Sequence, residues 1–105
     1  MRPLAGERLI HENLLFLYFS DMKDTVLTEK MQSKIHEFID VCKANDKMDG
    51  TRIVDTAIEL YSKGLGVSLQ EISKKTNMSD ASLYRFRIKM ADRLKAYLTE
   101  NVAPV

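Results

Sequence analysis

The chain is poor in the residues that cross-link or interrupt a fold. Its 105 residues include one cysteine, two prolines, four glycines and no tryptophan. A lone thiol, Cys42, forms no internal disulfide, which excludes the cystine-rich scaffolds of small secreted proteins and indicates a reducing compartment. So few prolines and glycines exclude a collagen-like or low-complexity chain. We therefore expect one cytoplasmic globular domain with a modest core.

Membrane and signal segments are also missing from the pattern. The apolar run from Leu14 to Phe19 is only six residues long, whereas a bilayer-spanning helix needs roughly 20. It has neither the cationic start nor the small-residue cleavage site of a signal peptide. A run this apolar is expected either to complete the core or to form part of a dimer interface.

Signatures of catalysis and of cofactor binding are absent as well. His11 and His36 each precede a glutamate, but no His-Glu-x-x-His motif and no second cysteine accompanies them, so we expect no metal site. Gly64 and Gly66 lack the Lys-Ser/Thr pair of a phosphate loop. No nucleophile with an orienting base is indicated by spacing, so we expect no enzyme and no cofactor.

Charge is divided unevenly along the chain. Positions 1 to 62 carry eight Lys/Arg against eleven Asp/Glu, a net charge of −3. Positions 63 to 98 carry eight Lys/Arg against three Asp/Glu, a net charge of +5. A basic segment inside a nearly neutral chain points weakly to a polyanionic partner, and a solvated lysine-rich surface is the alternative.

Apolar periodicity predicts a chain that is almost entirely helical. The stretch from Glu7 to Met22 fits a helix, although its apolar run fits a short strand equally well. Apolar residues between Thr28 and Asn45 recur at helical spacing, and we expect Asn45 to end that helix before a polar loop at Asp46 and Lys47. A third helix is predicted from Arg52 to Lys63, ended by Gly64. Its inward residues are expected to be Ile53, Val54, Ala57, Ile58, Leu60 and Tyr61.

Two further helices are predicted around a tight turn. Ser68 and Glu71 form a capping-box pattern that begins a short helix, and Asn77 tolerates the left-handed conformation that would end it. Ser79 then begins a helix whose apolar positions keep helical spacing to about Leu98. Those positions are Leu83, Phe86, Met90, Leu94, Tyr97 and Leu98. Residues from Asn101 onward are expected to fray.

A short helix, a tight turn and a longer helix are the components of a helix-turn-helix. Ser73 supplies the small residue wanted near the helix crossing, and Asn77 stands where glycine is commonest. The stretch GVSLQEISKKTNMSDASLYRFRIKMADRL, from Gly66 to Leu94, resembles the DNA-binding domain of LuxR/NarL-type response regulators. RIVDTAIELYSKG, from Arg52 to Gly64, is similar to the first helix of TetR-type repressors. Neither pattern is complete, because the Leu-Thr-x-Arg-Glu start of the first family and the closing His/Tyr-Phe step of the second are missing.

These patterns predict an all-α helical bundle with a C-terminal helix-turn-helix. Positions 1 to 49 would form a helical oligomerisation or partner-binding arm, and positions 50 to 105 the DNA-binding region, in one compact domain. The expected function is sequence-specific binding of double-stranded DNA by a homodimeric transcription regulator, because one helix-turn-helix reads only a few base pairs. The alternative is a phage- or plasmid-type adaptor that binds RNA polymerase or another protein.

The predicted DNA contacts come from the last two helices. Arg85 is the candidate for a base edge, because a guanidinium pairs bidentately with guanine. Ala81 shares its outward face. The candidates for phosphate or mixed contacts are Lys74, Lys75, Ser79, Ser82, Tyr84, Arg87 and Lys89.

Overall fold

The computed structural model describes residues 2–20, 23–62 and 68–101, and those residues form six helices and no strand. In chain order the helices are α1 (Glu7–Phe19), α2 (Lys23–Val26), α3 (Glu29–Asp49), α4 (Ile53–Tyr61), α5 (Leu69–Thr76) and α6 (Asp80–Asn101). The predicted all-α class is confirmed. None of the helices within the described ranges is both long enough and apolar enough to cross a bilayer.

The apolar run in the first helix belongs to the core. Leu15 and Phe16 are buried, and the other four residues of the run are partly buried against the same cluster. The strand alternative is therefore excluded, and the run completes the hydrophobic core. Met22, at the predicted end of this helix, lies outside the described residues.

Helix α3 is longer than predicted. Thr28 caps its start by accepting a hydrogen bond from the Met31 amide at 3.1 Å. The predicted stripe is buried at Ile35, Phe38, Ile39 and Cys42. The predicted end at Asn45 is wrong, because the helix continues to Asp49 and ends at Gly50, whose left-handed φ of 68° suits glycine.

Asp46 joins the last turn of α3 to the start of α4. From that turn its Oδ1 accepts hydrogen bonds from the Thr51 hydroxyl at 2.5 Å and the Ile53 amide at 2.7 Å, and its Oδ2 accepts one from the Val54 amide at 3.0 Å. One carboxylate thus caps the start of α4, which has no cap of its own at Arg52. The predicted polar loop at Asp46 is therefore a helix turn that fixes the α3–α4 corner.

Helix α4 buries most of the residues predicted to face inward. Val54, Ala57, Leu60 and Tyr61 lie in the core. Ile58 was wrongly expected inside: it is 43 % exposed, because it falls at the edge of the buried face and lines an open groove. Lys63 and Gly64, predicted to end this helix, lie outside the described residues.

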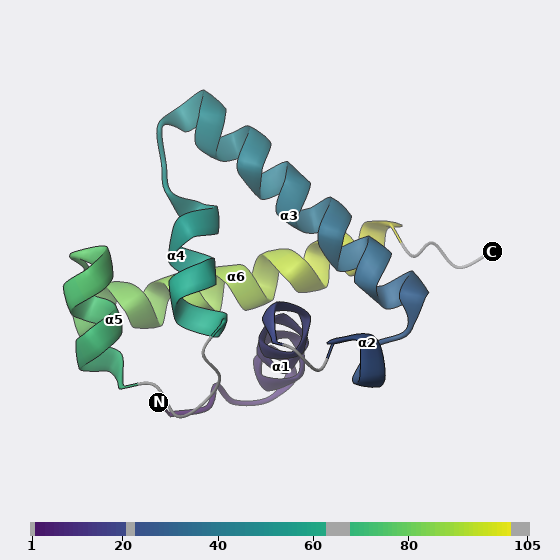
Figure 1. Ribbon diagram of the computed structural model, residues 1–105, viewed down its shortest axis with the longest axis horizontal. Helices are drawn as coiled ribbons and strands as arrows, with labels where there is room; N and C mark the ends of the chain where they lie inside the picture. Colours follow the sequence, from purple (N-terminus) through teal and green to yellow (C-terminus); the bar gives the residue numbers. More distant parts are fainter. Residues whose placement is uncertain (1, 21–22, 63–67, 102–105) are drawn as a thin grey trace.

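Helix α6 is the central element of the bundle. It runs across the molecule and packs against α1, α3 and α5, and Figure 1 shows α5 beside its first half and α1 nearly end-on below it. Leu83, Met90 and Leu94 of α6 join a core that draws residues from all five longer helices. The described residues of the two halves of the chain therefore share one hydrophobic core.

Candidate nucleic-acid interface

The corner between α5 and α6 is built by local hydrogen bonds. The Ser68 hydroxyl accepts a hydrogen bond from the Glu71 amide at 3.3 Å and begins α5. Asn77 ends α5 in the left-handed region, with φ of 56° and ψ of 35°. The Ser73 hydroxyl donates to the Met78 carbonyl at 2.5 Å and so closes the turn from inside. The sequence predicted each of Ser68, Ser73 and Asn77 at this corner.

The start of α6 gathers three of the predicted site residues. Ser79 accepts a hydrogen bond from the Ser82 amide at 3.1 Å, which is the predicted cap, and its hydroxyl also donates to the Ser82 hydroxyl at 3.0 Å. Arg85 donates to the same Ser82 hydroxyl at 3.4 Å. Hydroxyls and a guanidinium therefore lie together at a helix N-terminus, where exposed amides favour anions.

One face of the first half of α6 is open to solvent. Ala81, Arg85 and Lys89 are exposed and recur every four residues, so they share that face. Tyr84 is 53 % exposed at its edge. No ion pair among the described residues involves Arg85 or Lys89. The face therefore presents two positive charges without carboxylate partners in the described part of the chain.

The two lysines of α5 differ in their surroundings. Lys74 is exposed, and none of the ion pairs between described residues includes it. Lys75 lies 3.8 Å from the Glu59 carboxylate of α4, so part of its charge is neutralised across the α4–α5 contact. Lys74 is thus the stronger cation of the pair toward solvent.

Arg87 corrects the predicted set of DNA contacts. The residue is only 1 % exposed, so its side chain does not reach a ligand at the surface. Its Nε and Nη2 donate to the two carboxylate oxygens of Glu12 at 2.7 and 2.6 Å, and Nη2 also donates to the Arg2 carbonyl at 2.5 Å. The guanidinium is buried because Glu12 of α1 compensates its charge inside the bundle.

A signal for this buried pair was present in the sequence. Arg87 stands in the apolar stripe Leu83, Arg87, Met90 and Leu94, at spacings of four, three and four residues. Glu12 stands likewise on the buried face of α1, three and four residues before Leu15 and Phe16. Opposite charges at inward positions of two helices indicate a buried pair more strongly than a surface contact.

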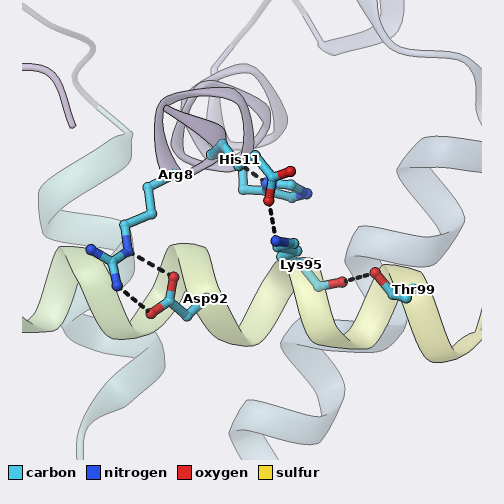
Figure 2. Close-up of polar contacts among 6 residues, drawn as sticks. Arg8, His11, Asp92, Lys95 and Thr99 are labelled. Atoms are coloured by element: carbon cyan, nitrogen blue, oxygen red, sulfur yellow. Dashed lines mark hydrogen bonds and ion pairs between the residues drawn. The ribbon is translucent and has the colours of Figure 1, made fainter. Parts of the chain in front are cut away.

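Two exposed ion pairs reinforce the same contact between α1 and α6, and Figure 2 shows both. Arg8 donates to both carboxylate oxygens of Asp92, at 2.9 and 3.1 Å, and this hydrogen bonding lowers the pKa of Asp92. Lys95 pairs with Glu7, and its hydrogen bond lowers the pKa of that carboxyl. Together with the buried pair of Arg87 and Glu12, these ion pairs hold α1 against α6.

A groove lies between α4, α5 and the first half of α6. Its volume is about 640 Å³. Apolar walls come from Ile53, Ile58, Met78 and Phe86, and Lys75 and Glu59 lie at its polar side. Helix α6 contributes Phe86 to this groove, and Ala81, Arg85 and Lys89 do not line it.

The remaining polar residues form no cluster suited to a metal. Among residues 2–20, 23–62 and 68–101, no three His, Cys, Asp or Glu side chains lie close enough together to hold an ion. Cys42 is buried, and burial raises the pKa of its thiol to about 11. His36 lies between the Tyr18 hydroxyl, 3.0 Å from its Nδ1, and Asp40, 3.5 Å from its Nε2.

Comparisons with protein-family models, with curated proteins and with solved structures found no match to this chain.

Proposed function

We propose that this protein binds double-stranded DNA through α5, the turn at 77–79 and α6, used as a helix-turn-helix, and that it regulates transcription. In such motifs the second helix enters the major groove and the first braces it across the backbone. Helix α6 would be the reading helix and α5 the bracing helix. The resemblance of Gly66 to Leu94 to LuxR/NarL-type domains supports the same assignment.

The observation that carries the proposal is the open face of α6. Ala81, Arg85 and Lys89 are exposed along it, directly after the capped turn. A major groove about 12 Å wide accepts one helix of about 10 to 12 Å diameter, so side chains on such a face reach base edges. A small residue beside a guanidinium suits this fit, because Ala81 permits close approach while Arg85 has the donors to pair with guanine.

Phosphate contacts would come from the residues around that face. Lys74 on α5 is exposed. The hydroxyls of Ser79 and Ser82 lie at the N-terminus of α6. Such contacts fix the register of a protein on DNA but carry no sequence information. Arg87 is buried and therefore does not contact phosphate. The Glu59 carboxylate near Lys75 weakens the attraction of that lysine for phosphate.

The experiment first selects a preferred site from a random duplex pool. Fluorescence anisotropy then measures the affinity of each variant for that duplex. Arg85→Ala should weaken binding to the preferred site by roughly 1 to 3 kcal/mol and flatten the preference at one position. Lys74→Ala should weaken all duplexes alike and reduce the salt slope by about one unit. Lys43→Ala, an exposed lysine on α3, is the matched charge control and should leave binding unchanged.

A second function, protein binding, is favoured by the groove between α4, α5 and α6. Its apolar walls, with Ile58 43 % exposed, are a surface on which a partner's side chains could pack. An adaptor would bind RNA polymerase or another protein there. Binding that does not fall steeply with salt, and that survives Arg85→Ala and Lys74→Ala in folded protein, would contradict DNA reading and favour this alternative.

A further inference from the structure

Helix α3 carries two apolar stripes, and only the inner one packs in the core. The inner stripe is the buried set Ile35, Phe38, Ile39 and Cys42. Val41, Ala44 and Met48 recur at spacings of three and four residues, so they share a second face, roughly 140° around the helix from the first. Ala44 is exposed, as are Val41 at 45 % and Met48 at 83 %. These three residues are called the outer stripe below.

The outer stripe is separate from the surfaces described above. Figure 1 shows that α3 diverges from α6 toward its C-terminal end, where the outer stripe lies. Within the described chain, no residue of α3 lines the groove between α4, α5 and α6. The proposed DNA contacts lie on α5, on α6 and in the turn between them. The outer stripe is therefore a further apolar surface, open to solvent.

Two opposite charges flank the outer stripe along one edge. Asp40 and Lys47 are seven residues apart, close to two helical turns, so they lie on the same edge with roughly 10 Å of axial rise between them. Lys47 is exposed, and none of the ion pairs among the described residues includes it. The Asp40 side chain is 56 % exposed, with its carboxylate 3.5 Å from His36 of the same helix. The edge is thus negative toward the start of α3 and positive toward its end.

This order of charges suits an antiparallel pair of α3 helices. A two-fold axis halfway between positions 40 and 47 sets Asp40 of each copy opposite Lys47 of the other. Val41 then falls between Ala44 and Met48 of the second copy, and the small side chain of Ala44, close to the axis, permits close approach of the two helices. A parallel pair would instead set Asp40 near Asp40 and Lys47 near Lys47, and would align the two helix dipoles unfavourably.

We propose that the outer stripe of α3 binds a second copy of this chain, as an antiparallel helix pair with reciprocal contacts between Asp40 and Lys47. The proposal goes beyond DNA binding and does not depend on it, because the surface carries none of the proposed DNA contacts. Three apolar residues from each copy make a small interface, so we expect a dissociation constant in the micromolar range.

The test is a charge exchange, followed by sedimentation of the full chain over micromolar concentrations without DNA. Asp40→Lys and Lys47→Glu each turn two attractive contacts into two repulsive ones, so each variant alone should dimerise roughly tenfold more weakly than the unaltered protein. An equimolar mixture of the two variants should regain the lost affinity as a heterodimer. In that heterodimer the two altered positions face each other with opposite charges, and so do the two unaltered ones.

Lys43→Glu is the matched control. It makes the same change of net charge as Lys47→Glu at an exposed position of α3 that points further from the outer stripe. It should leave dimerisation unchanged. Circular dichroism of each variant checks that the fold is retained.

Recovery in the mixture, with weak dimerisation of each variant alone, supports the antiparallel pair. An unaltered protein that stays monomeric at these concentrations overturns it. So does a mixture that dimerises no better than its components, because the charges then do not face each other. Equal losses in Lys43→Glu and Lys47→Glu also overturn it, because they report net charge only. Duplex binding is measured separately, so each of these results leaves the proposed DNA binding to its own test.

Discussion

The buried pair of Arg87 and Glu12 lies between two helices that are far apart in the sequence. Both side chains are only 2 % exposed, and they join α6 to α1. A buried pair contributes little relative to a well-packed apolar pair, but removal of one partner leaves an uncompensated charge in the core. Each of the two side chains is therefore tolerated in the core only while the other is present, which couples the stability of α1 to that of α6.

This coupling predicts a specific pattern of stability. Arg87→Met should lower the free energy of unfolding by about 3 to 5 kcal/mol, because Glu12 then stays buried without its partner. The double variant Glu12→Leu, Arg87→Met should recover most of that loss. Urea denaturation of both variants measures the difference. Single and double variants of equal stability would contradict the buried-charge argument.

Asp46 offers a pH-dependent prediction at the same scale. Burial raises the pKa of this carboxyl, but hydrogen bonds from Thr51 and from the Val54 and Ile53 amides outweigh it, so the net pKa is lowered. A carboxyl whose pKa is lower in the folded state stabilises above its unfolded pKa, about 3.9, and loses that effect as pH falls through the folded value.

Asp46→Asn should therefore be less stable than the unaltered protein by about 0.5 to 1.5 kcal/mol at pH 7, because asparagine has one acceptor oxygen where Asp46 uses two, and so loses at least one hydrogen bond. The difference should narrow as pH falls below about 4, because the unaltered carboxyl becomes protonated. Chemical unfolding at pH 7, 4 and 2.5 measures the difference. Asp49→Asn, exposed on the same helix, is the control. A difference that stays constant over this range would contradict the role of the charge.

At the scale of elements, the corner between α5 and α6 depends on one backbone conformation. Asn77 has φ of 56°, which costs most non-glycine residues about 1 to 2 kcal/mol. Asn77→Gly should be neutral or stabilising, and Asn77→Ala should destabilise by about 1 kcal/mol; thermal unfolding measures both. The same substitutions at Asn45, within α3, should show the opposite order, because glycine is the poorer helix former there.

The helices that the sequence predicted well are those specified by neighbouring residues. Ser68, Asn77 and Ser79 act on atoms within a few positions, so the corner between α5 and α6 could be predicted. Local capping patterns do not place Arg87, because its partner Glu12 is 75 positions away; its place in the apolar stripe of α6 is the sequence signal that indicates burial. The end of α3 was predicted too early, because the left-handed stop is Gly50, with φ of 68°, and Asn45 lies inside the helix.

At the scale of the whole molecule, packing redistributes the charge that the sequence shows. Arg87 and Lys95, from the basic segment, pair with Glu12 and Glu7 of the acidic segment. Lys75 is likewise close to Glu59. The positive charge that the basic segment presents to solvent is therefore smaller than a net charge of +5 suggests.

Dimerisation is the remaining prediction for the whole molecule. Half-sites on DNA repeat at about 34 to 36 Å, and the molecule measures 44 × 32 × 25 Å, so two copies side by side match that spacing. Apolar side chains outside the proposed interface are exposed on α1, at Ile10, and on α3, at Val41 and Met48. These are the surfaces on which a second copy is expected to pack.

Sedimentation at micromolar concentration should therefore report about twice 12.1 kDa. Met48 is 83 % exposed, so Met48→Glu should weaken a dimer formed through α3 without unfolding the monomer, and Ile10→Glu tests α1 in the same way. Loss of the dimer in one variant would identify the helix that forms the interface. A dimer on a palindromic site is expected because a single reading helix contacts only a few base pairs. A protein that is monomeric in solution and remains monomeric when bound to duplex DNA would contradict both expectations.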